Sequence, residues 1–140
     1  MEKNEILMIH GKDYKEMTKR LLREAELDTR IPDRRCRIGI KPNLVSPTEA
    51  SYGATTHPEI IAGILEYLQE RNYENLVILE GSWVGDRTAE AFQVCGYDSL
   101  AKQYGVELVD TQKDSTTSCD CAGMQLQICD SALALDFLIN

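Results

Sequence analysis

Short apolar runs alternate with amphipathic segments along this chain, and this alternation constrains the fold more than any other feature. Runs of four apolar residues, as at 6–9 and 76–79, have the length of buried strands. The segments between such runs carry apolar residues three or four positions apart, which is helical spacing. Strands that alternate with helices are typical of a parallel sheet covered by helices. The predicted strands are residues 6–9, 36–42, 76–79, 106–109 and 124–129, and a further apolar run follows at 134–139.

From this order we predict an α/β fold, a three-layer, mostly parallel sheet with helices on both faces. The element order is βαβαβα(α)ββ, and the last strands are expected as antiparallel additions at an edge. A length of 140 residues suits a single domain, residues 1–140. The predicted helices start at Asp13, at Thr56, at Asp86 or Thr88, and at Ser99.

The clearest helix start is the segment 56–59, Thr-His-Pro-Glu. It has the form of a capping box, in which Thr56 is the N-cap and Glu59 reaches back to it. Pro58 then stands in the first turn, where its missing N–H costs nothing. The apolar stripe that follows predicts a helix to about Arg71, with Asn72 as its left-handed end.

The net charge of −8 is unevenly distributed and excludes some functions. Residues 1–40 hold 10 basic and 8 acidic side chains, whereas residues 41–140 hold 5 basic and 15 acidic ones. An acidic surface repels phosphate backbones, so we expect no nucleic-acid partner. No apolar run exceeds four residues, so we expect no membrane span. Without a secretory signal at its start, the chain is expected to be soluble and cytoplasmic.

Five cysteines in such a chain are expected to be reduced thiols. Cys36 and Cys95 lie in apolar periodic segments and are expected in the core. Cys119, Cys121 and Cys129 cluster near the end, but their spacing matches neither a zinc site nor an iron–sulfur site. Free loop thiols are the favoured interpretation. A metal site completed by a ligand from elsewhere is the alternative, and it would make the protein a metal-linked redox protein.

Polar residues follow the second, third and fourth predicted strands, where ligands bind in open α/β sheets. Lys41 and Asn43 follow the second strand, Glu80 and Ser82 the third, and Asp110 the fourth. Lysine beside a helix start is a combination that binds a carboxylate or a phosphate. The predicted anion site therefore consists of Lys41 and the helix start Thr55, Thr56 and His57. In the competing interpretation Thr56 is only a helix cap and Lys41 only a solvated strand end.

Two blocks of sequence resemble a known family. Residues 38–45 read Ile-Gly-Ile-Lys-Pro-Asn-Leu-Val, and residues 53–59 read Gly-Ala-Thr-Thr-His-Pro-Glu. Together with the segments 105–110 and 136–140 they resemble the family called domain of unknown function 362. As matches to the family's blocks, the resemblance implies Lys41, Asn43, Thr55, Thr56 and His57 as candidate site residues. The resemblance implies a longer protein, and some members carry ferredoxin-like segments and are called iron–sulfur proteins. This sequence has no such segment. The family is distantly similar to nickel-dependent lactate racemase, which implies a site for a small acid or a cofactor between two domains.

The last residues, 136–140, predict a strand that nothing follows. An exposed edge strand invites aggregation, so we expect an amino-terminal fragment of a longer protein, or an end that something covers. Three functions stay open at this point. The first is an α/β domain that binds a small anionic molecule as part of a larger enzyme. The others are the metal-linked redox protein and an interaction module that docks through its terminal strand, as in a homo-oligomer. Substrate, reaction and cofactor are left open.

Overall fold

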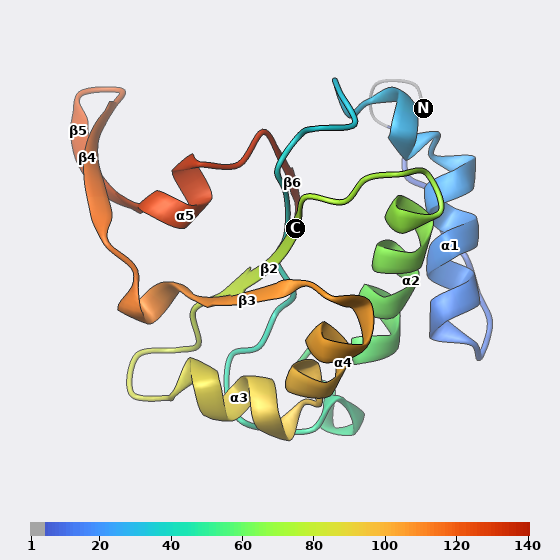
Figure 1. The fold of residues 1–140 in the computed structure, drawn as a ribbon. Helices are drawn as coiled ribbons and strands as arrows, with labels where there is room; N and C mark the ends of the chain where they lie inside the picture. Colours follow the sequence, from blue (N-terminus) through green and yellow to red (C-terminus); the bar gives the residue numbers. More distant parts are fainter. Residues whose placement is uncertain (1–4) are drawn as a thin grey trace.

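A computed structural model of the chain describes residues 5–140 and contains a four-stranded parallel sheet (Figure 1). Its strand order is β3-β2-β1-β6, and every neighbouring pair is parallel. The bounds are β1 Ile38–Ile40, β2 Leu76–Glu80, β3 Glu107–Asp110 and β6 Phe137–Ile139. Two further strands, β4 (Thr116–Cys121) and β5 (Met124–Cys129), form a separate antiparallel hairpin. The predicted fold class, a mostly parallel α/β sheet flanked by helices, is confirmed.

The two faces of the sheet are covered to different extents. Ile38, Ile40 and Ile78 point to one face and pack in a core cluster with residues of α2, α3 and α4. On the other face, a side chain added at Gly39 would collide with Leu135, but Leu138, which pairs with Gly39, is 50% exposed. Figure 1 shows α2, α3 and α4 beside the sheet. The helices are α1 (Tyr14–Glu24), α2 (Pro58–Gln69), α3 (Thr88–Val94), α4 (Tyr97–Tyr104) and α5 (Asp130–Leu133), with 3₁₀ turns at Leu27–Thr29, Ala50–Tyr52 and Thr111–Lys113.

Residues 6–9 were predicted as the first strand, and this prediction is wrong. The chain is not in a strand there, and Ile6 and Met8 are 85% and 75% exposed. An apolar run becomes a strand only when another strand pairs with it, and β3 and β6 are the two edges of the sheet in the described part of the chain. The prediction of antiparallel edge strands also needs correction. Strand β6 is parallel to β1, and the antiparallel pair β4–β5 lies outside the main sheet.

Helix α2 begins at Pro58, one residue later than a Thr56 N-cap implies; its N-cap is His57, and no side chain caps it. The Thr56 hydroxyl instead accepts a hydrogen bond from the backbone N–H of Asn43. The start of α3 differs in the same way. Neither Asp86 nor Thr88 is its N-cap, and the Thr88 hydroxyl accepts from the backbone N–H of Ser82. In both places the threonine hydroxyl that was expected to cap the helix accepts a hydrogen bond from the backbone of a neighbouring loop instead.

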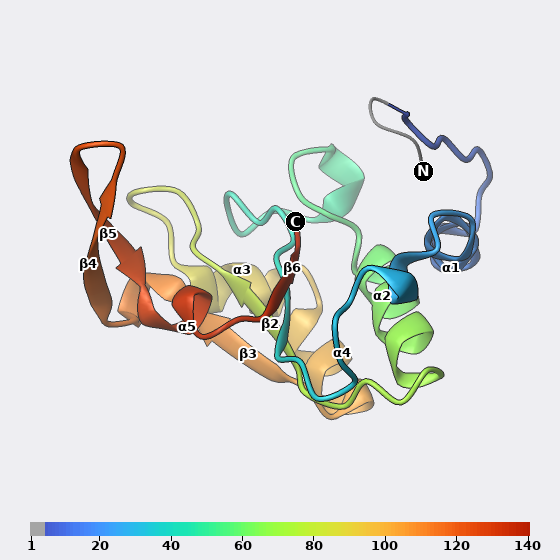
Figure 2. The same cartoon turned by 90° about the horizontal axis from the view of Figure 1, so that it is seen from above.

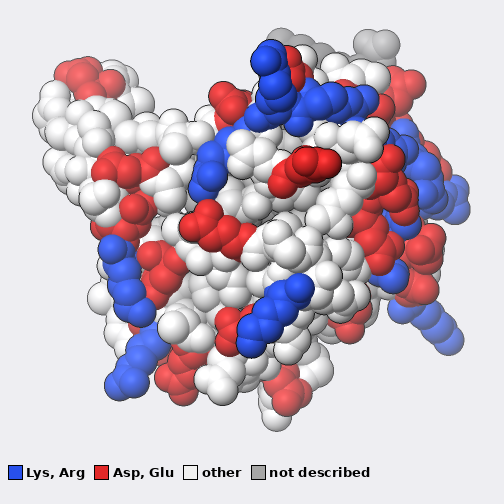
Figure 3. All heavy atoms as spheres, viewed as in Figure 1, with Lys and Arg blue, Asp and Glu red and all other residues white. Residues whose placement is uncertain are grey.

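The hairpin β4–β5 extends away from the body of the molecule. Seen from above, it lies on the opposite side of the sheet from α1 (Figure 2). Acidic and basic side chains are mixed over the body, whereas the hairpin shows almost no charge apart from acidic atoms at its tip (Figure 3). Among residues 115–129 the sequence has one charged side chain, Asp120.

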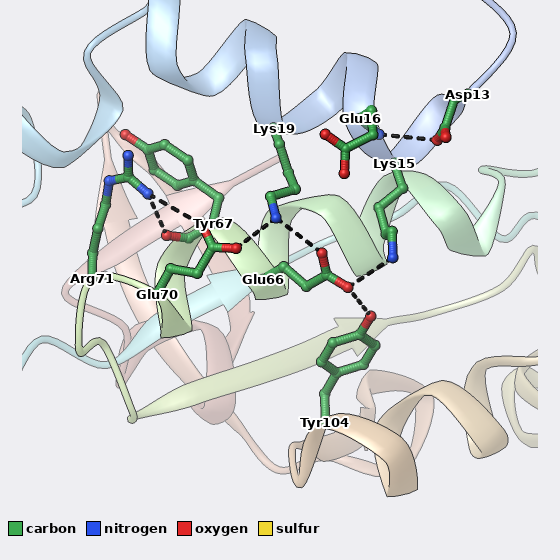
Figure 4. Close-up of polar contacts among 9 residues, drawn as sticks. All are labelled: Asp13, Lys15, Glu16, Lys19, Glu66, Tyr67, Glu70, Arg71 and Tyr104. Atoms are coloured by element: carbon green, nitrogen blue, oxygen red, sulfur yellow. Dashed lines mark hydrogen bonds and ion pairs between the residues drawn. The ribbon is translucent and has the colours of Figure 1, made fainter.

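Helix α1 contains no fully buried residue and is attached to α2 partly by charged groups (Figure 4). The Glu66 carboxylate on α2 accepts from Lys15 Nζ at 2.9 Å and from Lys19 Nζ at 3.1 Å, both on α1. It also accepts from the Tyr104 hydroxyl of α4 at 2.8 Å. These contacts lower the pKa of Glu66 to about 2, chiefly through the hydrogen bond from Lys15. One carboxylate therefore joins three helices. Asp13 caps α1 as predicted, because its side chain accepts from the backbone N–H of Glu16.

Candidate ligand-binding site

A groove of about 500 Å³ opens at the carboxyl ends of β1 and β6, beside the first turns of α2. Its polar lining is Lys41, Asn43, Thr56 and Asn140. Its apolar lining is Ile40, Pro42, Ile60, Ile61, Ile64 and Ile139. The structure thus brings three of the five predicted site residues, Lys41, Asn43 and Thr56, to one hollow. This is the position where open parallel sheets bind ligands.

Lys41 is positioned by the end of β1, where its backbone N–H still donates to the carbonyl of Ile139 on β6 at 2.8 Å. Its ammonium group donates to the Pro42 carbonyl at 3.3 Å and to Glu80 Oε2 at 3.4 Å. A lysine ammonium has three protons, so one donor is left beyond these two contacts. The side chain is 38% exposed, and that donor is within reach of a molecule in the groove.

Glu80, at the end of β2, fixes the loops around this lysine. Its side chain is 8% exposed. Its Oε2 accepts from the backbone N–H of Leu44 at 3.1 Å, and its Oε1 accepts from that of Gly81 at 2.7 Å. A buried carboxylate needs partners of this kind, because burial without them is costly. Glu80 therefore holds the segment after β1 against the end of β2 and keeps the Lys41 ammonium at the groove.

Asn43 and Thr56 bind each other across the loop that joins β1 to α2. The N–H of Asn43 donates to Thr56 Oγ1 at 2.9 Å, and the N–H of Thr56 donates to the Asn43 carbonyl at 2.8 Å. The Asn43 amide donates to the Ala54 carbonyl at 2.9 Å. Tyr97, the first residue of α4, supports this loop, because its hydroxyl donates to the Thr56 carbonyl at 3.1 Å. Burial raises the pKa of Tyr97, so this hydroxyl keeps its proton and remains a donor.

Thr55 and His57, the other two predicted site residues, do not line the groove. Thr55 is 7% exposed, and its hydroxyl donates to the Thr48 carbonyl at 2.9 Å, which is a structural role. The His57 ring lies 4.4 Å from the ring of Tyr14, and its Nδ1 is 3.8 Å from a Glu59 carboxylate oxygen. Alternate residues of this short segment point in different directions, so only Thr56 reaches the groove.

Glu80 and Asp110 occupy neighbouring strand ends, because β2 pairs with β3 in the register Glu80↔Asp110. Asp110 is engaged by the N–H of Gln112 at 3.1 Å and by Lys113 Nζ at 3.2 Å. Within residues 5–140, no group of three or more His, Cys, Asp or Glu side chains has a geometry that could hold a metal ion. The two carboxylates thus serve the loops that follow their strands.

The fold does not bring the side chains of Cys119, Cys121 and Cys129 together. Cys119 and Cys121 are two residues apart on β4, so their side chains share one face of the hairpin. Cys129 pairs with Thr116, an odd number of positions from Cys119, and its side chain therefore belongs to the opposite face. Three thiols divided between two faces cannot share one metal ion. Cys36 and Cys95 are buried, as predicted.

Sequence reasoning missed the contacts by which polar residues support the site. Ser82 is buried, and its hydroxyl donates to the Leu44 carbonyl at 2.7 Å. The Gln112 amide donates to the Ser82 carbonyl at 2.9 Å. The strand-end rule had pointed to Glu80 and Ser82 as positions of interest, but nothing local in the sequence identifies Leu44 or Gln112 as their partners.

Comparison with known proteins gives one match. A family model described as Domain of unknown function (DUF362) matches residues 38–140, which include the sheet, the groove and the hairpin. No curated protein and no solved structure matches the chain. The similarity to nickel-dependent lactate racemase and the cytoplasmic location stay predictions. In residues 5–140, no helix has the length and apolar character needed to cross a membrane.

Proposed function

Because this chain belongs to the DUF362 family, whose description assigns no activity, we propose its function from the groove: the domain binds a small anionic molecule, a carboxylate or a phosphate, through Lys41. Asn43 and Thr56 supply the remaining polar contacts. The expectation that this site works within a larger enzyme stays a prediction. The iron–sulfur alternative has less support, because the thiols it needs lie on two faces of the hairpin.

One observation carries the proposal. Among residues 5–140, Lys41 is the one charged side chain that lines the groove, and it stands where β1, β6 and the start of α2 meet. Its partner Glu80 is buried behind it and holds it with a single contact at 3.4 Å. Glu80 is already satisfied by two backbone N–H groups, so the lysine can turn toward an anion without leaving a buried carboxylate alone.

The apolar lining of the groove adds a preference among anions. Ile60, Ile61 and Ile64 of α2 and Ile139 of β6 line the groove together with Lys41. A molecule with a charged end and a short hydrocarbon body would contact both parts, and burial of apolar surface contributes about 25 cal/mol per Å². We therefore expect a short-chain carboxylate to bind more tightly than inorganic phosphate.

The test is thermal unfolding with and without added anions at constant ionic strength. Inorganic phosphate and butyrate should raise the melting temperature of the wild type, butyrate more strongly, because a ligand that binds only the folded state stabilises it. Lys41→Met keeps most of the side-chain volume and removes the charge, and it should abolish both shifts. Lys102→Met, an exposed lysine on α4 outside the groove, is the matched control and should keep them. Equal shifts in the two variants would show that the anions act on the general surface and would refute the proposal.

A further inference from the structure

Helix α1 contacts α2 differently along its two flanks. On one flank Lys15 and Lys19, one turn apart, reach Glu66 of α2 (Figure 4). Between the flanks the two helices approach closely, because a side chain added at Gly63 of α2 would collide with the Lys15 carbonyl and with Thr18. The other flank of α1 carries apolar side chains, yet no residue of this helix is fully buried. The packing of α1 on its apolar flank is therefore incomplete.

A hollow of about 340 Å³ lies along this apolar flank. Met17, Leu21 and Leu22 of α1 line it, together with Ile9 before the helix and with three isoleucines of α2 and β6. Among residues 5–140, no charged side chain lines it. Protein interiors contain few voids larger than a water molecule, whereas pockets for small molecules begin at about 300 Å³. The hollow is therefore large enough to take part of a small molecule, and its walls suit hydrocarbon.

The polar groups at the hollow do not change this character. Tyr14 and Thr18 supply its polar side chains. The Thr18 hydroxyl donates to the Tyr14 carbonyl at 2.7 Å, so it is already satisfied within α1. Burial of a hydrocarbon against these walls leaves neither that hydroxyl nor a charge without a partner.

The hollow adjoins the groove that contains Lys41. Ile60, Ile64 and Ile139 line both spaces. Ile60 and Ile139 are only partly buried, so a molecule can lie across them with one end in each space. The groove has an ammonium group and polar side chains, whereas the hollow has apolar walls. Together they fit a molecule that is charged at one end and hydrocarbon at the other.

The charge at the groove also indicates which anion forms the head of such a molecule. Lys41 is the one cation in the groove lining of residues 5–140, and the buried carboxylate of Glu80 lies 3.4 Å from its ammonium. A phosphate monoester carries a charge of about −1.5 to −2 at neutral pH, whereas a carboxylate carries a single charge. One lysine beside a carboxylate therefore suits a monoanion better than a dianion.

We propose that the ligand of the Lys41 groove is a medium-chain carboxylate, of the hexanoate-to-decanoate class, whose hydrocarbon tail lies in the hollow between α1 and α2. The inference rests on the proposed function, because the groove supplies the contact with the carboxylate. It extends that function by naming the class of molecule. Short carboxylates and inorganic phosphate use the groove alone and bind more weakly.

Isothermal titration calorimetry with butyrate, hexanoate, octanoate and decanoate, each below its micelle concentration, tests the tail. Each added methylene should tighten binding by up to about fourfold, and the gain should level off once the hollow is filled. Octylammonium has the same tail as octanoate and the opposite charge, so it should bind at least about tenfold more weakly, since Lys41 repels it. This series needs no substitution and is independent of whether a variant folds.

A pair of neighbouring substitutions tests the position of the tail. Ile9→Asp places a charge in the hollow and should remove the advantage of octanoate over butyrate, because a buried charge opposes contact with hydrocarbon. Met8→Asp is the matched control, since Met8 is 75% exposed and does not line the hollow. It adds the same charge and should keep the advantage. Both variants retain Lys41 and should bind butyrate alike, and circular dichroism confirms that each is folded.

The outcomes separate this inference from the proposed function. An affinity that does not rise from butyrate to octanoate would overturn the inference and leave the anion site at Lys41 standing. Aspartate variants that weaken octanoate binding equally would have the same meaning. Octanoate bound as tightly by Lys41→Met as by the wild type would instead refute the anion site itself, and the inference that rests on it.

Discussion

Two glutamates, Glu66 on α2 and Glu80 at the end of β2, each join segments that are distant in the sequence, and they do so with different partners. Glu66 accepts from three side chains, those of Lys15, Lys19 and Tyr104. Glu80 accepts from two backbone N–H groups and from Lys41. The side chain of Glu66 is 24% exposed, whereas that of Glu80 is 8% exposed.

Because of this difference, the contacts of Glu66 can rearrange, whereas those of Glu80 are fixed by the backbone. Side-chain donors such as Lys15 can move, find water or be screened by salt, so their contacts contribute little each. Backbone donors of a buried loop have no such freedom, and an unpaired one costs the full loss of solvation. We therefore expect Glu66 to tune how firmly α1 is attached, and Glu80 to decide whether the loop beside the groove forms.

The largest expected effect is that of Glu80→Ala. The substitution leaves the N–H groups of Leu44 and Gly81 without their acceptor. Leu44 is buried and Gly81 is exposed, so only the Leu44 group bears the full cost of an unsatisfied buried group, about 1–3 kcal/mol. We expect the free energy of unfolding, measured in urea, to fall by about 2 kcal/mol. Glu80→Gln keeps one carbonyl oxygen as an acceptor and should recover part of this loss. A fall below about 1 kcal/mol in the alanine variant would mean that the loop does not depend on the carboxylate.

The two glutamates also mark how far the sequence alone leads. Strand β2 and, to within one residue, the start of α2 were predicted, because four successive apolar residues and a proline in a first turn are local signals. Glu80 was reached through the rule that ligands bind at strand ends. Glu66 was not singled out, because its partners Lys15 and Lys19 lie 51 and 47 positions away and nothing near Glu66 points to them.

The errors have the same origin. The apolar run at 6–9 reads as a strand, but pairing is a tertiary property that no local pattern supplies. Thr56 reads as a cap, yet the backbone of Asn43, 13 positions away, occupies its hydroxyl. Strand β4 was missed because its residues are mostly small and polar, and it forms through its antiparallel pairing with β5.

Glu66→Gln should have a smaller effect than Glu80→Ala. The amide removes the charge that holds Lys15 and Lys19, but both ammonium groups can return to water. We expect the free energy of unfolding at neutral pH to fall by about 1 kcal/mol. Glu70→Gln is the matched control on the same helix, since Glu70 is 53% exposed and contacts only Lys19 of α1. If Glu70→Gln lowers the free energy of unfolding as much as Glu66→Gln does, the contacts of Glu66 with three helices add no stability beyond that of an exposed ion pair.

The pH dependence of the Glu66 contribution follows from its pKa, which the Lys15 hydrogen bond and its other contacts lower from 4.5 to about 2. A carboxyl with a lowered folded-state pKa stabilises the fold fully above its ordinary value, and the stabilisation is lost as pH falls toward the folded value. The difference in unfolding free energy between wild type and Glu66→Gln should thus be constant from pH 7 to 5 and shrink between about pH 4.5 and 2. The other carboxyl groups titrate alike in both proteins and cancel. A difference unchanged at pH 2.5 would contradict the assigned contacts.

The smallest expected effect is that of Arg20→Ala, which removes an exposed ion pair within one helix and serves as the reference for Glu66→Gln. Arg20 Nε donates to Glu24 at 2.7 Å one turn further along α1, and the two side chains are 65% and 44% exposed. Such pairs contribute about 0.3–0.5 kcal/mol, and a base that precedes the acid is the weaker orientation. We expect a change in unfolding free energy below about 0.5 kcal/mol, which 0.5 M sodium chloride should reduce to nothing measurable. Glu66 contacts of similar length join three helices. A loss for Glu66→Gln that clearly exceeds the loss for Arg20→Ala therefore measures what partial burial and shared partners add to an ion pair.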